Sequence, residues 1–343
     1  MQLTDRQKLI LTLIIHEHIH TAQPVGSKSL VEKFNLAMSS ATVRNEMVAL
    51  TECELLRQPH TSAGRVPTEE GYRYFVGNLV QQSALPTTTR RTIAHQFYQS
   101  RQDIEQWLKL AASVLANQSQ AASLVTAPRA EKAIFKHMEL IAIRGRQVLM
   151  VIVFMDGEVR QQFISLAEPV PQERLSQIAD RLTDLCARGD IDQVSRLRGQ
   201  LGTLGQEILD ILLAEMALVE GSATGEIYLD GMTNVLSEPE FSESDEARQA
   251  LHILEERSLL ENLLVSTVMN TDVGGIQVLI GGEGGWEQLR QCSVVLARYG
   301  DPNSLTGSIG VLGPIRMPYD RTISTVRFVA NVLSDLVSDT LAS

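Results

Sequence analysis

The stretch Val25–Arg73, VGSKSLVEKFNLAMSSATVRNEMVALTECELLRQPHTSAGRVPTEEGYR, decides the fold of the N-terminal region. It predicts a helix, a short turn, a second helix and then a hairpin whose tip, residues 59–64, is small and polar. This order of elements is typical of a winged helix-turn-helix, a module that reads DNA. Another helix is expected after Thr68, because Glu69 and Glu70 suit the positive end of a helix.

The second helix of this stretch follows two serines. Ser39 and Ser40 precede its first turn, where a serine hydroxyl can accept hydrogen bonds from free backbone amides. Val43, Met47 and Leu50 recur at i, i+4 and i+7, so they form one apolar stripe that faces the core. The stripe fixes which side of the helix remains exposed.

The exposed side of that helix carries residue types that suit base edges. Ala41, Thr42 and Asn45 point away from the apolar stripe, and Arg44 lies on its flank. Arginine forks onto guanine, asparagine pairs with adenine, and small methyl groups fit against thymine. The alternative is an ordinary solvated helix face. The hairpin that follows directly favours the DNA-binding interpretation over this alternative.

The hairpin and the preceding helix supply donors for phosphates. Small residues at the tip let the backbone approach DNA. The side chains that can hold it there are His60, Thr61, Ser62 and Arg65. Lys28 lies in the first turn of the preceding helix and can also reach a phosphate. An ordinary turn is the alternative for the tip. The candidate DNA-binding residues are Lys28, Ser39, Ser40, Thr42, Arg44, Asn45, His60, Thr61, Ser62 and Arg65.

The net charge of −11 argues mildly against nucleic-acid binding when it is taken for the whole chain. Its distribution matters more, because residues 1–80 hold eight basic and eight acidic residues and are neutral. The acidic remainder would stand off from DNA and leave the neutral end to approach. Binding is therefore expected to depend on a few placed contacts and on two copies that act together.

Length and composition indicate a soluble protein of two or three domains. The chain has 343 residues, no apolar run of membrane-span length, and no signal-peptide pattern in its first residues. Its three cysteines, Cys53, Cys186 and Cys292, are far apart and odd in number, which favours a reducing compartment and no metal cluster. We expect a cytoplasmic protein without membrane contact.

After a linker rich in threonine (residues 83–89), the chain is expected to form helices and then a sheet. A long helical block then separates two groups of strands. The expected strands cover residues 122–126, 139–143, 148–154, 159–166, 226–229, 276–280, 293–299 and 307–312, and the block covers 171–219. Such a block indicates an inserted subdomain, whose apolar faces a dimer partner would cover.

No residue grouping in the sequence supports an enzyme. Ser/His/Asp sets, paired carboxylates and metal-ligand spacings do not stand out. The glycine-rich segment 275–285 (GIQVLIGGEGG) lacks the GK[ST] of a phosphate-binding loop, so a strand that ends in a glycine turn is expected. We expect no catalytic residue, no metal and no cofactor.

Four segments carry a resemblance to a known family. PVGSKSL (24–30), SSATVRNEM (39–47), HTSAGRVPTEEGYRYFV (60–76) and GSIGVLGPIRMPYDRTI (307–323) resemble bacterial heat-inducible transcription repressors of the HrcA family. The resemblance implies an α+β fold in which a winged helix precedes a GAF-like sheet domain with a helical dimerisation insert. The boundaries expected are 1–82 for the winged helix, 83–100 for a linker helix, 101–168 and 223–343 for the GAF-like domain, and 169–222 for the insert.

The same resemblance implies a function. Such a repressor binds an inverted-repeat operator, the CIRCE element, as a homodimer ahead of chaperone operons, and the chaperonin GroEL supports its activity until heat shock. Two other classes remain open from the residues alone. One is a winged-helix regulator gated by a small molecule in the GAF-like domain, and the other is a chaperone-side interaction protein whose wing is vestigial.

Overall fold

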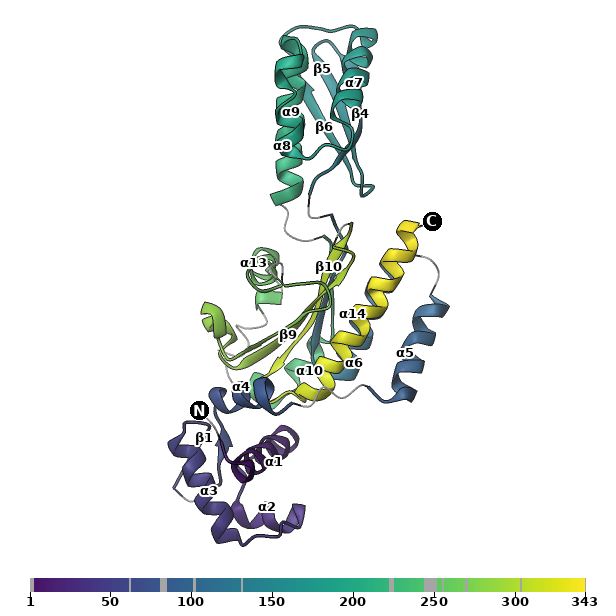
Figure 1. Cartoon of the computed structure of the whole chain (residues 1–343). Helices are drawn as coiled ribbons and strands as arrows, with labels where there is room; N and C mark the ends of the chain where they lie inside the picture. Colours follow the sequence, from purple (N-terminus) through teal and green to yellow (C-terminus); the bar gives the residue numbers. More distant parts are fainter. Residues whose placement is uncertain are drawn as a thin grey trace. The chain divides into compact units, whose positions relative to one another are not determined.

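The computed structural model describes residues 3–61, 63–80, 85–100, 103–130, 132–221, 225–243, 252–254, 256–268, 271–302 and 304–342. The chain forms two compact units (Figure 1). The first comprises Met1–Ala127, Glu226–Gly300 and Gly307–Ser343, and the second comprises Pro128–Gly225 and Asp301–Thr306. Both contain helices and strands, so the fold is of the mixed α+β kind that the sequence predicts.

The first unit begins with a small helical module that ends in a two-stranded ribbon. Its elements are α1 (Asp5–Thr21), α2 (Ser27–Phe34), α3 (Ser40–Glu52), β1 (Leu56–Arg57), β2 (Val66–Pro67) and α4 (Glu69–Asn78). The apolar faces of its helices meet in a shared core that includes Ile10, Ile14, Leu30, Val43 and Leu50, each at most 1% exposed. We call residues 3–80 the N-terminal module.

The rest of the first unit is built on a five-stranded sheet with the strand order β7-β3-β10-β9-β8. The strands are β3 (Ala122–Thr126), β7 (Ile227–Asp230), β8 (Ile276–Ile280), β9 (Cys292–Gly300) and β10 (Thr306–Pro314). The helices are α5 (Thr87–Gln99), α6 (Ile104–Ser119), α10 (Met232–Leu236), α11 (Pro239–Glu243), α13 (Arg257–Thr267) and α14 (Tyr319–Ala342), with short turns η2 (Glu283–Gly285) and η3 (Glu287–Leu289).

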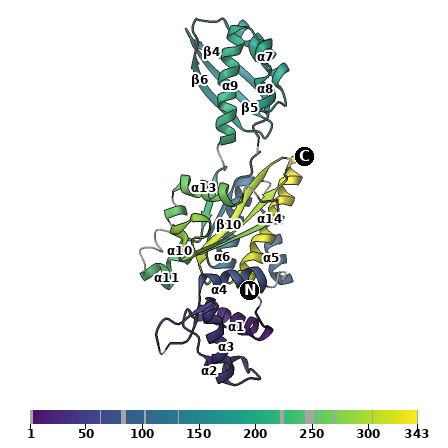
Figure 2. The same ribbon diagram turned by 60° about the vertical axis from the view of Figure 1, so that its left-hand side comes forward.

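Helices cover both faces of this sheet (Figures 1 and 2). α6 and α14 pack on one face, and residues of α10, α11 and α13 share a core with the other face. Because both faces are covered, every residue of β9 and β10 is buried. This explains why these two strands read as nearly continuous apolar runs in the sequence.

The second unit is a three-stranded antiparallel sheet backed by helices on one face (Figure 2). Its elements are β4 (Phe135–Arg144), β5 (Gln147–Phe154), β6 (Val159–Ser165), α7 (Gln172–Cys186), α8 (Ile191–Ser195), η1 (Arg198–Gln200) and α9 (Thr203–Gly221). A tight turn that includes Asp156 and Gly157 joins β5 to β6, with Gly157 at a φ of +88° that favours glycine. Alternate residues of β5 enter a core shared with the helices.

The second unit differs from the insert expected at 169–222. The strands over 139–166 pair with one another as β4-β5-β6 and not with the five-stranded sheet, so the unit begins at Pro128. The helical block is also not continuous, because the chain leaves the helix between α7 and α8 and again near η1. Periodicity identified the strands, but it carries no information on which strands pair.

The longer segment of the second unit, Pro128–Gly225, leaves the first unit after β3 and returns to it before β7. β3 and β7 are antiparallel neighbours with Thr126 opposite Ile227, and the backbone N–H of Ala127 donates to the carbonyl of Glu226 at 2.7 Å. The two ends of this segment therefore meet at neighbouring strands of the first unit. No described helix is both long and apolar enough to cross a membrane.

Candidate nucleic-acid interface

The sequence of α3 positions its outer face by local rules. Ser39 is the N-cap, and its hydroxyl accepts from the backbone N–H of Thr42 at 3.1 Å. Val43, Met47 and Leu50 are buried, as their spacing predicts. This leaves one side of the helix exposed in its first two turns.

The loop from β1 to β2 is held back against the helices. The side-chain amide of Gln58 donates to the carbonyls of Thr61 and Ala63 at 2.9 and 3.0 Å. Arg65 and Val25 exchange two backbone hydrogen bonds of 2.8 and 2.9 Å, which adds a short third strand to the ribbon. Gly64 is required here, because an added Cβ would lie 2.4 Å from the backbone of Val25.

The structure describes nine of the ten candidate residues, and Ser62 lies outside the described residues. Thr42 and Arg65 are half-buried. The exposed candidates are Lys28, Ser39, Ser40, Arg44, Asn45, His60 and Thr61. These positions are compatible with the expected role.

Two of the candidates also have roles inside the module. The hydroxyls of Ser39 and Thr42 lie 2.9 Å apart and share a hydrogen bond at the start of α3. Arg65 donates through Nε to the hydroxyl of Thr51 at 3.1 Å, which ties the ribbon to α3. Lys28 forms only a solvent-exposed pair with Glu32 at 3.8 Å, a contact that contributes little to stability.

A hollow between α2, α3 and the β1–β2 loop brings three candidates together. Arg44, Thr61 and Arg65 line it, with Ser27 and Gln58 beside them. Ser27 opens α2, whose first turn has no side-chain cap, so its amides are available to an anion. Sequence reasoning missed Ser27 and Gln58, although Gly26 before Ser27 indicated an uncapped helix start.

The charges of the module are distributed more favourably for DNA than their sum suggests. Five of its eight basic side chains pair with carboxylates: Arg6 with Glu46, Lys8 with Asp5, Lys28 with Glu32, Lys33 with Glu17, and Arg73 with Glu69 and Glu70. Arg44, Arg57 and Arg65 have no carboxylate partner in the described part of the chain. Arg44 and Arg65 line the same hollow, so two unpaired positive charges meet there, whereas Arg57 lines a different hollow with His18 and Glu54.

The described residues also bear on two other kinds of site, metal-binding sites and reactive thiols. No group of three or more His, Cys, Asp or Glu side chains among them is placed to hold a metal ion. Cys186 and Cys292 are buried, and burial raises their thiol pKa values to about 11 and about 12. Thiols with such pKa values are poor nucleophiles.

Comparison with known proteins identifies the family. The model of the HrcA protein C-terminal domain matches residues 105–323. The heat-inducible transcription repressor HrcA of Roseiflexus castenholzii is 44% identical over 98% of this chain and 95% of its own length. Those of Herpetosiphon aurantiacus and Thermomicrobium roseum are 41% and 40% identical, each over 99% of this chain and at least 96% of their own lengths.

A solved structure, described as that of a hypothetical protein at 2.2 Å resolution, is also similar. It is 26% identical to this chain, covers 98% of each chain and superposes with a TM-score of 0.59. A family model that matches well over half of the chain and relatives that align along nearly all of it lead to one conclusion. The chain belongs to the HrcA family of heat-inducible transcription repressors.

Proposed function

We propose that this protein represses chaperone operons by binding an inverted-repeat operator, the CIRCE element, as a homodimer. In this proposal the N-terminal module is a winged helix, with α3 in the major groove and the β1–β2 ribbon as the wing. The observation that carries it is that Arg44 and Arg65, which have no carboxylate partner among the described residues, line one hollow between α2, α3 and the β1–β2 loop. The family membership supports the same role.

The contacts divide into two classes. Arg44 and Asn45 are exposed early in α3 and are proposed to read base edges, together with Thr42. The α2 start at Ser27, Lys28, Ser40, and the loop residues His60, Thr61 and Ser62 are proposed to hold phosphates. Ser39 and Arg65 support both classes, through the helix cap and the bond to Thr51.

We further propose that the second unit is the dimerisation insert, within a GAF-like domain formed by the five-stranded sheet. The apolar faces of its helices are covered by its own sheet, so they do not require a partner. The opposite face of that sheet is different, because Ile141, Ile143, Val159 and Phe163 are 41–71% exposed. Ile141 and Phe163 flank Leu149 across the three strands, and a second copy would bury this row.

The test is binding of the full chain to a duplex with the inverted repeat of the organism's own chaperonin promoter. We expect one dimer per repeat, much weaker binding when either half-site is scrambled, and a footprint over both half-sites. Equal affinity for the repeat and for a scrambled duplex of the same length would exclude the proposed function.

The resemblance adds a partner, the chaperonin GroEL, and a response to heat. If the active dimer is more stable than an inactive form by only a few kcal/mol, a small loss of support shifts operator occupancy strongly, since about 1.4 kcal/mol is tenfold. We expect the DNA-binding fraction to fall after heating and cooling, and to recover with GroEL and ATP. Full operator affinity through repeated heating without chaperonin would contradict this part of the proposal.

A further inference from the structure

Arg316 joins the N-terminal module to the sheet domain of the same unit. It lies between β10 and α14, and its side chain is 11% exposed. Its Nη1 donates to the carbonyl of Ile19 at 3.1 Å, across 297 positions of sequence. Its other nitrogens meet Glu240, at 2.5 and 3.0 Å in a forked pair, and Glu238.

The carbonyl that Arg316 contacts belongs to the last turn of α1. Carbonyls in the last turn of a helix lack partners within the helix, and together they carry partial negative charge. The guanidinium of Arg316 therefore satisfies the end of α1 while two carboxylates hold it in place. Burial lowers the pKa of Arg316, but hydrogen bonds and charge from Glu240 and Glu238 outweigh burial and raise it, so the residue stays charged.

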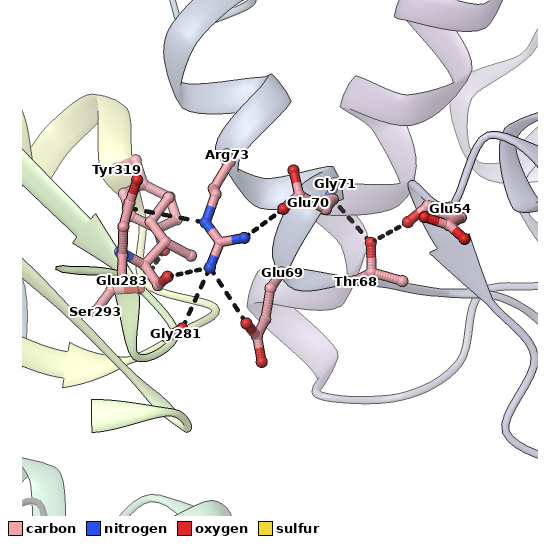
Figure 3. A network of polar contacts seen from close by, with 11 residues as sticks. Glu54, Thr68, Glu69, Glu70, Gly71, Arg73, Gly281, Glu283, Ser293 and Tyr319 are labelled. Carbon is pink, nitrogen blue, oxygen red and sulfur yellow. Dashed lines mark hydrogen bonds and ion pairs between the residues drawn. The ribbon is translucent and has the colours of Figure 1, made fainter. Parts of the chain in front are cut away.

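A second arginine lies in the N-terminal module and contacts the sheet domain (Figure 3). Arg73 of α4 donates through Nη2 to the carbonyls of Ile280 and Gly281, at 2.8 and 3.2 Å. Its Nε lies 3.8 Å from Glu283, and Glu69 and Glu70 of its own helix hold the other side. Gly281 allows this approach, because an added Cβ would lie 2.6 Å from the Glu69 carboxyl carbon.

Between the two arginines, a hollow is lined in part by aromatic side chains, the half-buried His18 and the buried Tyr72. His18 of α1 is hydrogen-bonded to the hydroxyl of Tyr72 at 2.8 Å, and Tyr72 packs against Tyr319 with ring centres 6.0 Å apart. The hydroxyl of Tyr319 in turn lies 2.6 Å from that of Ser293 in β9. The junction thus combines a chain of aromatic and hydroxyl contacts with the ion pairs of Arg316 and of Arg73.

We propose that Arg316 is a positioning residue for DNA binding, which holds α1, and through it α3, in the orientation that an inverted repeat requires. The proposal rests on the proposed function. α1 packs directly on α3, so the contact at Ile19 constrains the reading helix without touching its outer face. Removal of the guanidinium would leave Glu238 and Glu240 beside the negative end of α1, and their repulsion would release the module.

The experiment compares operators whose half-sites are separated by spacers that increase in single base pairs through one turn, about 10.5 base pairs. Full-length wild type should bind one spacing best and lose binding as the half-sites rotate apart. Arg316→Gln should bind that spacing at least tenfold less tightly and show a flattened dependence on spacing. Its affinity for a single half-site at low salt should remain within about twofold of the wild-type value.

Three further variants complete the design. Arg321→Gln is the matched control, because Arg321 follows in α14 and makes only an exposed contact with Gln118. Glu240→Gln keeps the volume of the junction and tests the proposal if Arg316→Gln folds poorly, with an intermediate flattening expected. Arg316→Lys keeps the charge without the fork and should restore part of the spacing dependence.

The outcomes separate the two proposals. A flattened spacing profile with unchanged half-site affinity supports the positioning role. A parallel loss of affinity for every spacing and for the half-site would indicate a purely structural role and overturn it, as would variants that keep the wild-type profile. If wild type itself shows no preference for the inverted repeat, the proposed function fails first.

Discussion

At the residue scale, the candidate interface shows what a sequence can and cannot specify. The Ser39 cap and the Val43, Met47 and Leu50 stripe were predictable, because each depends on spacing within one helix. The bond from Arg65 to Thr51 was not, because it joins the ribbon to another element. The number of charges likewise does not show which basic side chains pair with carboxylates. It therefore did not identify the three arginines that have no acidic partner among the described residues.

The first prediction at this scale concerns the reading face of α3. Arg44→Ala and Asn45→Ala should each weaken operator binding by about 1–3 kcal/mol and relax preference at one base pair. Lys28→Ala should weaken all duplexes alike and reduce the salt slope by about one unit. Competition binding with single-base operator variants measures both, and an unchanged base preference in Arg44→Ala would contradict the assignment.

The second prediction concerns pH and His18. Burial, and then the charge of Arg316, lowers the pKa of His18 to about 4, with Arg57 acting in the same direction and Glu240 against it. The folded state therefore disfavours the proton that the unfolded chain takes up near pH 6.5. Stability from this residue is complete above pH 6.5 and decreases as the pH falls towards 4.

The loss should be of the order of 1–3 kcal/mol, reduced by the partial exposure of the ring. His18→Gln, which can still hydrogen-bond to Tyr72, should show a flatter pH dependence of the unfolding free energy between pH 7 and 4.5. Chemical denaturation at a series of pH values measures this. Parallel curves for the two proteins would show that another group controls the transition.

At the element scale, helix and strand positions followed from periodicity, whereas strand partners did not. β4, β5 and β6 alternate in the manner of a half-exposed sheet, and the sequence predicted each of them as a strand. Their membership of a second sheet depends on contacts between segments, which a repeat of two residues cannot encode. The same limit applies to α4. Its close contact with the carbonyl of Leu55, just before β1, joins two segments that periodicity does not relate.

A prediction at this scale concerns Gly71 in α4. A Cβ at this position would lie 2.1 Å from the carbonyl oxygen of Leu55, so Gly71→Ala must displace the helix. We expect a loss of about 1–3 kcal/mol in unfolding free energy, by urea denaturation. Gly77→Ala in the same helix is the control, because nothing lies within 4 Å of its Cβ position, and it should be neutral or stabilising by up to about 1 kcal/mol.

At the scale of the whole molecule, the two units have different surfaces. The five-stranded sheet is covered on both faces, while the three-stranded sheet leaves one apolar face uncovered by the described residues of its own unit. The sequence predicted that an insert would need a partner but assigned the need to the helices. In the proposed dimer, the exposed row across β4, β5 and β6 is the surface that the partner would cover.

The corresponding prediction is that Phe163→Glu, alone or with Ile143→Glu, converts the dimer to a monomer. A charge at these positions would have to be buried in the proposed interface. Sedimentation at micromolar concentration should show the change, and operator binding should weaken towards that of a half-site. Tyr98→Glu is the control, since Tyr98 is 89% exposed on α5 and outside this face.

The hydrogen bond from Ala127 to Glu226 has a consequence for how the chain could be shortened. A segment that departs and returns between adjacent antiparallel strands can be excised and the gap closed by a tight turn such as Asn-Gly. The shortened protein would retain every strand of the larger sheet.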